Sequence, residues 1–309
     1  MVFQHALLTR FNTDWFLSKS RSQQERNSAE FLEHRFRIFE KTCLPSVNAQ
    51  SNLNFFWLLL LDAGLPEGFR ERIAHYSSAS RVKIHPVYIE DRSVFLPRLK
   101  QAIAAKIVPE TRFLISTNLD SDDAIARNFI ARVQEQFREQ KLEFVNFLFG
   151  YLYRMQEQKL YLREWRTAPC YTLIESIDGF KTVLKYGHTS ITRFNHCQIA
   201  TEPLWLMTVH GQNVKTQFDV SAAWQPLNRL GDRFQVELDL PQKRAAQSLG
   251  EMWQEIGQVL TSPWPSDTPK VKTKKILNIL SPPLLQLATG KRNRIFSRSQ
   301  HLSLLPRVR

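Results

Sequence analysis

The most constraining feature of this chain is an apolar run that ends in three carboxylates. Residues 112–119 have a β-type pattern, and Asp120, Asp122 and Asp123 follow within four positions. Carboxylates two residues apart on an extended segment point the same way. Their hard oxygen atoms suit Mg²⁺ or Mn²⁺, which one or two carboxylates hold while water and substrate phosphates complete the coordination. The sequence therefore predicts a metal site at the end of a strand.

Two of these three residues also fit the start of a helix. Asp122 would be the N-cap, and Asp123 would lie in the first turn, near the positive end of the helix dipole. The helical period then continues through Ile125, Phe129, Ile130, Val133 and Phe137. This interpretation leaves Asp120 unexplained, because a third carboxylate at the end of a buried strand is repelled without a cation. We therefore favour the metal site.

Strand-like and helix-like segments alternate through the first half of the chain, a pattern typical of a parallel sheet covered by helices. The predicted strands cover residues 5–9, 55–61, 81–89 and 112–117, and the predicted helices cover 29–43 and 95–107. The second half is less regular, with predicted strands at 144–154, 159–165 and 172–176 and helices at 180–185 and 251–260. The acidic residues follow the fourth strand, so they are expected at the sheet edge where such folds bind ligands.

Apolar content and cysteine usage exclude several classes of protein. Hydrophobic residues make up 43% of the 309, and the longest apolar run, residues 55–61, is too short to span a membrane. The amino terminus lacks a secretory signal pattern, so a cytoplasmic location is expected. Cys43, Cys170 and Cys197 are odd in number and widely spaced, which argues against a disulfide framework and a structural zinc site.

The net charge of +13 is concentrated near the carboxyl terminus. Residues 266–309 hold ten basic residues and one acidic residue, so the first 265 residues carry only +4. Prolines within residues 263–269 indicate a linker, and we expect one α/β domain over residues 1–262 followed by a linker and basic tail over 263–309. Leucine-rich patches between the basic clusters fit an anionic membrane surface better than a nucleic acid. A solvated tail that packs partly on the domain is the alternative.

Five short motifs occur in a fixed order along the chain. They are Thr9-Arg10-Phe11-Asn12, Leu44-Pro45-Ser46-Val47-x-x-Gln50, Asn54-Phe55-x-Trp57-Leu-Leu-x-x-Asp62, Leu119-Asp120-x-Asp122-Asp123-Ala124 and His210-Gly211-x-Asn213-Val214. Together, over about residues 3 to 220, they resemble a family of bacterial rhamnosyltransferases, a branch of the inverting, GT-A-type glycosyltransferases. The resemblance implies a GT-A-like (Rossmann-like) mixed sheet flanked by helices, with an acceptor-binding second half.

The resemblance also implies roles for residues at the nucleotide. Thr9 and Arg10 would lie in a loop beside the nucleotide, Asp62 would contact the base or ribose, and Asp120 would lie near the ribose or sugar. Asn118 departs from the family, which often has arginine two residues before the first aspartate. From the residues alone, Asp62 at a strand end is equally well explained as the cap of the loop before Gly64.

At the metal, the resemblance assigns Asp122 and Asp123 as ligands of Mn²⁺ or Mg²⁺ and brings His210 towards the diphosphate or metal from the far side. A neutral imidazole can be a metal ligand, although a lone histidine is as often hydrogen-bonded in a core.

A catalytic base is less clearly marked. Inverting sugar transfer needs a carboxylate or histidine to take the proton of the acceptor hydroxyl. Glu175 follows an apolar run and would project from a strand end, and His188 lies in a turn-like segment and can titrate near neutrality. Asp178 precedes Gly179 and is interpreted as a turn residue. Glu175 and His188 therefore remain the two candidates.

These expectations combine into a metal-dependent, inverting glycosyltransferase. Its donor would be a nucleotide sugar, with rhamnose from dTDP-rhamnose taken from the resemblance, and its acceptor a saccharide or lipid-linked saccharide of the cell surface. An enzyme located at the inner face of the membrane would suit such an acceptor. Two other classes use the same residues: a metal-dependent nucleotide-sugar hydrolase or nucleotidyltransferase, and a non-catalytic basic binding protein.

Overall fold

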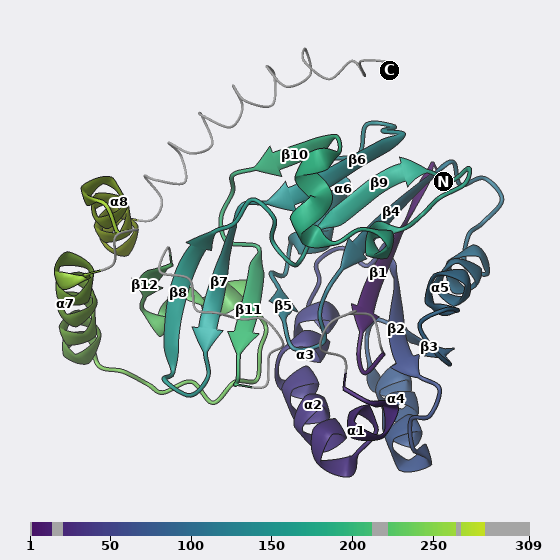
Figure 1. Cartoon of the computed structure of the whole chain (residues 1–309), viewed down its shortest axis with the longest axis horizontal. Helices are drawn as coiled ribbons and strands as arrows, with labels where there is room; N and C mark the ends of the chain where they lie inside the picture. Colours follow the sequence, from purple (N-terminus) through teal and green to yellow (C-terminus); the bar gives the residue numbers. More distant parts are fainter. Residues whose placement is uncertain (1, 14–20, 212–221, 264–266, 282–309) are drawn as a thin grey trace. The chain divides into compact units, whose positions relative to one another are not determined.

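The computed structural model describes residues 2–13, 21–211, 222–263 and 267–281 (Figure 1). The chain forms two compact units. The first comprises Met1–Val145, Thr167–His196 and Asp232–Leu238, and the second comprises Asn146–Arg166, Cys197–Gly231 and Asp239–Arg309. This division differs from the expected single domain over residues 1–262, because the chain already leaves the first unit at residue 146 and again at residue 197.

A seven-stranded mixed sheet organises the first unit, in the order β10-β6-β9-β4-β1-β2-β3. Its strands are β1 (Phe3–Arg10), β2 (Phe56–Asp62), β3 (Ile84–Ile89), β4 (Phe113–Asn118), β6 (Leu142–Phe147), β9 (Thr172–Ser176) and β10 (His196–Ile199). The boundary between the units falls within β6 and within β10. Strands β4, β1, β2 and β3 are parallel, and β9 is antiparallel to β4 and β6. The carboxyl ends of β1, β2 and β4 therefore share one edge.

Helices cover both faces of this sheet because the buried residues of its strands alternate between the two faces. On one face, Leu58 and Leu60 pack with Phe95 and Leu99 of a buried apolar cluster. On the other face, the Trp57 ring packs near the Phe39 ring, with the two ring centroids 5.9 Å apart. The helical elements are α1 (Gln23–Arg26), α2 (Ala29–Lys41), α3 (Cys43–Asn48), α4 (Glu67–Ala79), α5 (Phe95–Ala104), α6 (Phe129–Gln134), η1 (Val183–Lys185), η2 (His188–Arg193) and η4 (Gly231–Arg233). The predicted class, a mixed sheet flanked by helices, is confirmed.

The second unit is built on a smaller sheet. Its strands β7 (Phe149–Arg154), β8 (Lys159–Glu164), β11 (Trp205–Val209) and β12 (Ala223–Gln225) lie in the order β12-β8-β7-β11. Strand β7 is antiparallel to β8 and parallel to β11. The backbone of β7 approaches the Trp205 ring so closely that a Cβ built on Gly150 would lie 1.9 Å from it. Only glycine fits at this position, since a larger residue would displace the ring.

Two helices pack against β12 and against each other, α7 (Ala245–Thr261) and α8 (Pro269–Leu280), and the short η3 (Leu227–Arg229) follows β12. Helix α8 belongs to the second unit, so residues 269–280 are part of a folded element, whereas the sequence predicted a tail. Residues 264–266 and 282–309 of the predicted linker and tail lie outside the described residues. Among the described residues, no helix combines the length and apolar character needed to cross a bilayer.

Candidate active site

The three predicted carboxylates lie in a turn at the carboxyl end of β4. The backbone N–H of Asp123 donates to the carbonyl oxygen of Asp120 at 3.1 Å, which closes the turn. The chain then forms the two-residue strand β5 (Ala124–Ile125), and helix α6 begins only at Phe129, with Asn128 as its N-cap. The prediction that a helix starts at Asp123 is therefore wrong. The interpretation of Asp122 as a helix cap, which competed with the metal site, is excluded.

Arg10 pairs with Asp120 across the carboxyl ends of β1 and β4. The Arg10 Nη2 atom lies 2.6 Å from Oδ1 of Asp120, and the two side chains are 15% and 31% exposed. Burial alone would lower the pKa of Arg10, but the charges of Asp120 and Asp122 and the hydrogen bond to Asp120 raise it above its ordinary value. Arg10 thus neutralises one of the three carboxylates.

Asp122 is half-buried and Asp123 is 6% exposed. Burial raises the pKa of the Cys43 and Cys170 thiols, and the Asp123 charge raises the pKa of both further. The two thiols therefore stay protonated, as expected of buried cysteines without a nucleophilic role. Asp122 and Asp123 add two carboxylates to the one that Arg10 pairs with, and Arg35 Nη1 donates to the Ser121 hydroxyl in the same turn at 2.6 Å.

That donor set fits a divalent cation. Mg²⁺ and Mn²⁺ take carboxylate oxygens, and a phosphate-bound Mg²⁺ needs only one or two of them from the protein. Among the described residues, no three His, Cys, Asp or Glu side chains are grouped as an all-protein metal site would require. Asp122 and Asp123 therefore suit a cation that arrives with a substrate phosphate, and their role as ligands stays a prediction.

Asp62, at the carboxyl end of β2, is 2% exposed, and both oxygens of its carboxylate accept hydrogen bonds. Its Oδ1 accepts hydrogen bonds from Gln23, Asn27 and the backbone N–H of Gly64, at 3.0, 3.1 and 2.8 Å. Its Oδ2 accepts one from Arg26 Nη2 at 3.0 Å. Burial alone would raise the pKa of Asp62, but these bonds lower it below its ordinary value. The carboxylate thus holds helix α1 and the loop after β2 in place.

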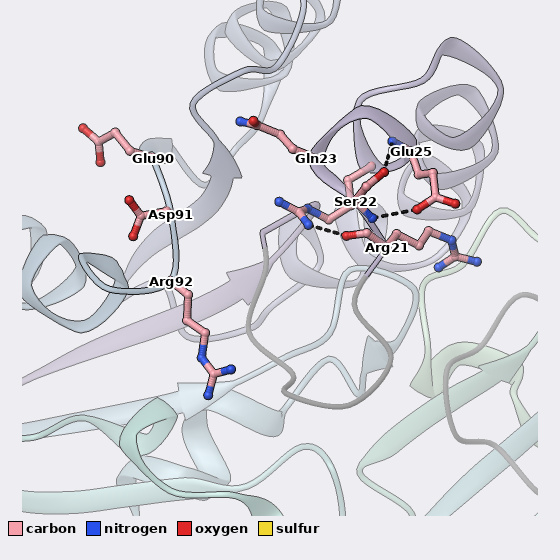
Figure 2. A pocket seen from close by; sticks show the side chains of 8 residues that line it. Arg21, Ser22, Gln23, Glu25, Glu90, Asp91 and Arg92 are labelled. Carbon is pink, nitrogen blue, oxygen red and sulfur yellow. Dashed lines mark hydrogen bonds between the residues drawn. The ribbon is translucent and has the colours of Figure 1, made fainter.

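Helix α1 lines a cavity of about 560 Å³ beside this network. Figure 2 shows residues of α1 on one side and the segment after β3 on the other. The lining side chains are polar or charged: Arg21, Ser22, Gln23, Glu25, Arg26, Glu90, Asp91 and Arg92. Gln23 and Arg26 belong both to the cavity and to the Asp62 network. Asp62 therefore shapes the cavity wall through the residues that it binds.

Thr9 is placed differently from the prediction. It lies within β1 rather than in a loop, is fully buried, and pairs with Leu59 of β2. Its hydroxyl accepts a hydrogen bond from the Trp57 indole at 2.9 Å. Arg10, the last residue of β1, is half-buried and lies at the edge of the sheet, so it is the member of this pair that a ligand can reach.

Glu175 does not join the acidic residues. Strand β9 runs antiparallel to β4 and pairs Glu175 with Leu114, near the amino end of β4. The carboxylate is 3% exposed and accepts hydrogen bonds from the backbone N–H groups of Lys181 and Thr182 at 2.8 and 2.9 Å. Burial raises the pKa of Glu175. At the opposite end of β4 from Asp120, this residue holds a turn and does not reach an acceptor bound near the carboxylates.

His188 lies on the side of the acidic residues. Its ring centroid is 6.3 Å from that of Tyr171, whose backbone carbonyl accepts from the N–H of Asn118 at 3.0 Å, at the end of β4. The Tyr171 hydroxyl donates to the backbone carbonyl oxygens of Val183 and Tyr186, and burial raises its pKa. The Nδ1 atom of His188 is 2.7 Å from the carbonyl oxygen of Thr167. Because a carbonyl only accepts, Nδ1 carries the hydrogen, and the basic lone pair of the neutral ring is on Nε2.

His210 follows β11 in the second unit and is partly exposed. Its predicted role at the metal stays a prediction. Asn118, which stands where the resembling family often has arginine, donates from Nδ2 to the carbonyl oxygen of Pro169 at 2.8 Å. The positive charge beside Asp120 comes instead from Arg10.

Sequence reasoning missed the residues that hold the cavity. Helix α1 begins with a capping box, in which Ser22 and Glu25 exchange hydrogen bonds. The pattern Ser-x-x-Glu in residues 22–25 is a known signature of a helix start. It would have located the helix that brings Gln23 and Arg26 to Asp62. Tyr171 carried no such signal, because an aromatic residue in an apolar run predicts only a buried strand.

Comparisons with known proteins define the class of this protein. The family model described as "Putative rhamnosyl transferase" matches residues 4–222. The chain belongs to this family and is a glycosyltransferase. No curated protein matches the chain at a significant level.

Solved structures with similar folds are distant. S. aureus TarS is 11% identical with a TM-score of 0.36, and the match covers 91% of this chain but only 43% of TarS. Residues 1–349 of S. aureus TarS in complex with UDP are 12% identical, with 91% and 71% of the two chains covered and a TM-score of 0.35. HddC from Yersinia pseudotuberculosis is 12% identical, with 68% and 90% covered and a TM-score of 0.31. At these TM-scores, none of the three bears on the function of this chain.

Proposed function

We propose that this glycosyltransferase transfers rhamnose from dTDP-rhamnose to a saccharide or lipid-linked saccharide, with inversion and with the help of a divalent cation. The observation that carries this proposal is the placement of Arg10 and Asp120–Asp123 where the strand order reverses. From β1 the chain adds β2 and β3 on one side and β4 on the other, so the carboxyl ends of β1 and β4 flank a switch point. Ligands of open α/β sheets bind in the crevice at such a point. The choice of rhamnose rests on the name of the family.

In this proposal, Asp122 and Asp123 would hold Mn²⁺ or Mg²⁺, and that cation would offset the negative charge that develops on the departing nucleotide diphosphate. The polar cavity between α1 and the segment after β3 takes the nucleoside, and Asp62 shapes its wall through Gln23 and Arg26. Arg10 fixes the Asp120 carboxylate beside the sugar.

His188 is the proposed base. The lone pair on Nε2 takes the proton of the acceptor hydroxyl while that oxygen forms the new bond to C1 of the sugar. The acceptor oxygen attacks C1 on the face opposite the diphosphate, and the bond from C1 to the diphosphate breaks with its electrons on the leaving oxygen. C1 is therefore inverted. Glu175 is no longer a candidate for this step, because its carboxylate is at the other end of β4 and is bound to backbone N–H groups.

The test follows the sugar and the nucleotide separately. The chain is incubated with dTDP-rhamnose labelled in the sugar, with Mn²⁺, and with or without a lipid-linked saccharide extract, beside matched UDP- and GDP-sugars. Acceptor-dependent labelling with release of dTDP supports the proposal. Free rhamnose released equally well without acceptor identifies a hydrolase, and transfer from only UDP- or GDP-sugars rejects the assigned donor.

A further inference from the structure

Exposed apolar side chains concentrate on the last two described helices. Among the described residues, eight large apolar side chains are clearly exposed, and five of them lie on α7 and α8. We call these five the α7–α8 apolar surface: Leu249 (54% exposed), Trp253 (64%) and Leu260 (57%) on α7, with Leu277 (48%) and Leu280 (53%) on α8. Single exposed apolar residues are normal, but a group on one pair of helices marks an interaction surface.

The apolar side of α7 is wider than the part of that side that packs against the rest of the second unit. Ile256 is buried, and Met252 and Val259 are partly buried along the face that packs inward. Leu249, Trp253 and Leu260 are spaced by four and seven residues, so they form one stripe that extends this apolar sector into solvent. The opposite side of α7 carries Gln247, Glu251, Gln254 and Gln258. Helix α7 is therefore amphipathic, with an apolar flank that the unit does not use.

Three of the four lysines of α8 have polar partners within the second unit. Lys272 Nζ donates to the carbonyl oxygens of Leu260 and Ser262, at 2.8 and 3.0 Å, and so caps the end of α7. Lys274 pairs with Glu164 at 2.5 Å, and Lys275 with Asp267 at 2.8 Å. These three charges stabilise the fold of the second unit.

Positive charge is instead abundant in the sequence that follows α8. Residues 282–309 contain six basic residues and no acidic residue, and the whole chain carries +13. This charge repels a second copy of the chain and attracts an anionic surface. Stable attachment to a membrane surface needs two signals, and a basic segment next to an apolar one supplies both.

We propose that the α7–α8 apolar surface docks on an anionic lipid bilayer, with the α7 stripe entering the boundary between headgroups and acyl chains. A tryptophan at the centre of the stripe suits this depth, since indole is favoured at membrane interfaces. Trp253 is the exposed one of the five described tryptophans, the other four being buried or half-buried. It therefore reports directly on contact with lipid.

Vesicle flotation of the full chain tests this proposal. The wild type, Trp253→Glu and Leu249→Glu are compared on vesicles of phosphatidylcholine alone and of phosphatidylcholine with phosphatidylglycerol. Leu53→Glu is the matched control, because Leu53 is 41% exposed but lies in the first unit. Since burying one large apolar side chain accounts for about a tenfold change in partition, each α7 variant should bind anionic vesicles at least about tenfold more weakly. The control should match the wild type.

Trp253→Phe gives a second readout in a chain that keeps an apolar side chain. Anionic vesicles should shift the tryptophan emission of the wild type to shorter wavelength, and this shift should be lost in Trp253→Phe. Absence of binding to anionic vesicles overturns the proposal. So does binding that both glutamate variants retain in full, which would leave the basic segment as the sole contact. Concentration-dependent dimers that Trp253→Glu abolishes would assign the surface to a second copy instead.

Discussion

Replacing Asp62 by asparagine removes one buried charge at the carboxyl end of β2 while keeping the shape of the side chain. The amide has one accepting oxygen where the carboxylate has two, and its NH₂ group would face the Arg26 guanidinium or the other donors. The loss of a charged hydrogen bond costs about 1.5–3 kcal/mol. The bonds from Gln23, Asn27 and Gly64 weaken from charge-assisted to neutral, roughly 0.5 kcal/mol each. Since Arg26 is 12% exposed and partly rehydrates, we expect a total of about 3 kcal/mol.

A loss of about 3 kcal/mol in a unit of this size corresponds to a fall of roughly 6–12 °C in its melting temperature at neutral pH. The pH dependence has a definite sign. The pKa of Asp62 is lower in the folded state, so its stabilisation is present above the unfolded pKa of about 3.9 and is lost as the pH falls through the folded value. The difference between wild type and Asp62→Asn should therefore shrink in acid.

Differential scanning calorimetry from pH 3 to pH 7 provides the assay for Asp62→Asn, on the scale of about 2–4 °C per kcal/mol. Glu139→Gln is the control, because Glu139 pairs with Arg112 at 3.1 Å while both side chains are more than half exposed. An exposed pair of this kind contributes about 0–1 kcal/mol. The role assigned to the Asp62 network is refuted if Asp62→Asn lowers the melting temperature no more than Glu139→Gln does. It is also refuted if the decrease caused by Asp62→Asn is the same at every pH.

Three further predictions concern the second unit, the turn after β9 and the proposed base. Gly150→Ala should destabilise the second unit by about 1–3 kcal/mol in urea unfolding, because its Cβ would overlap the Trp205 ring, whereas Gly68→Ala, which meets nothing within 4 Å, should not. Burial raises the pKa of Glu175, so the free energy of unfolding should fall as the pH rises through that pKa and the buried carboxyl becomes charged. Urea unfolding at several pH values should show this fall in the wild type but not in Glu175→Gln. His188→Gln should lower the rate of sugar transfer about 10²–10⁴-fold, while a binding titration should show that its affinity for the donor is retained. A variant that loses transfer rate and donor affinity to the same extent would contradict the role of His188 as the base.

The carboxyl edge of the sheet could be located from the sequence, because several carboxylates directly after an apolar run mark the point where a buried strand reaches solvent or a ligand. Local patterns did not reveal that Ala124 and Ile125 continue into the core as a short strand, because the same apolar spacing also fits a helix. They predicted the strand that carries Glu175 but not its direction. Strand β9 is antiparallel to β4, which moves Glu175 to the wrong end of the sheet for catalysis.

Local sequence patterns could not predict contacts between residues that are far apart in the chain. Arg10 and Asp120 are 110 residues apart in the chain, and only the adjacency of β1 and β4 brings them together. Asp62 was expected either to contact the nucleotide or to cap its loop. Its bond to Gly64 matches the loop cap, and its bonds to α1 add a role that depends on the packing of a helix 36–39 residues earlier.

The central claim is that the carboxylates after β4 bind a nucleotide sugar through a divalent cation, and calorimetric titration with dTDP-rhamnose tests it most directly. Wild type, Asp122→Ala and the distant control Glu175→Gln are each titrated with Mn²⁺ and with chelator. We predict that wild type and Glu175→Gln bind the donor with Mn²⁺, and that chelation or Asp122→Ala weakens binding at least about tenfold, or 1.4 kcal/mol. Equal affinity with and without Mn²⁺, unchanged in Asp122→Ala, would contradict the account.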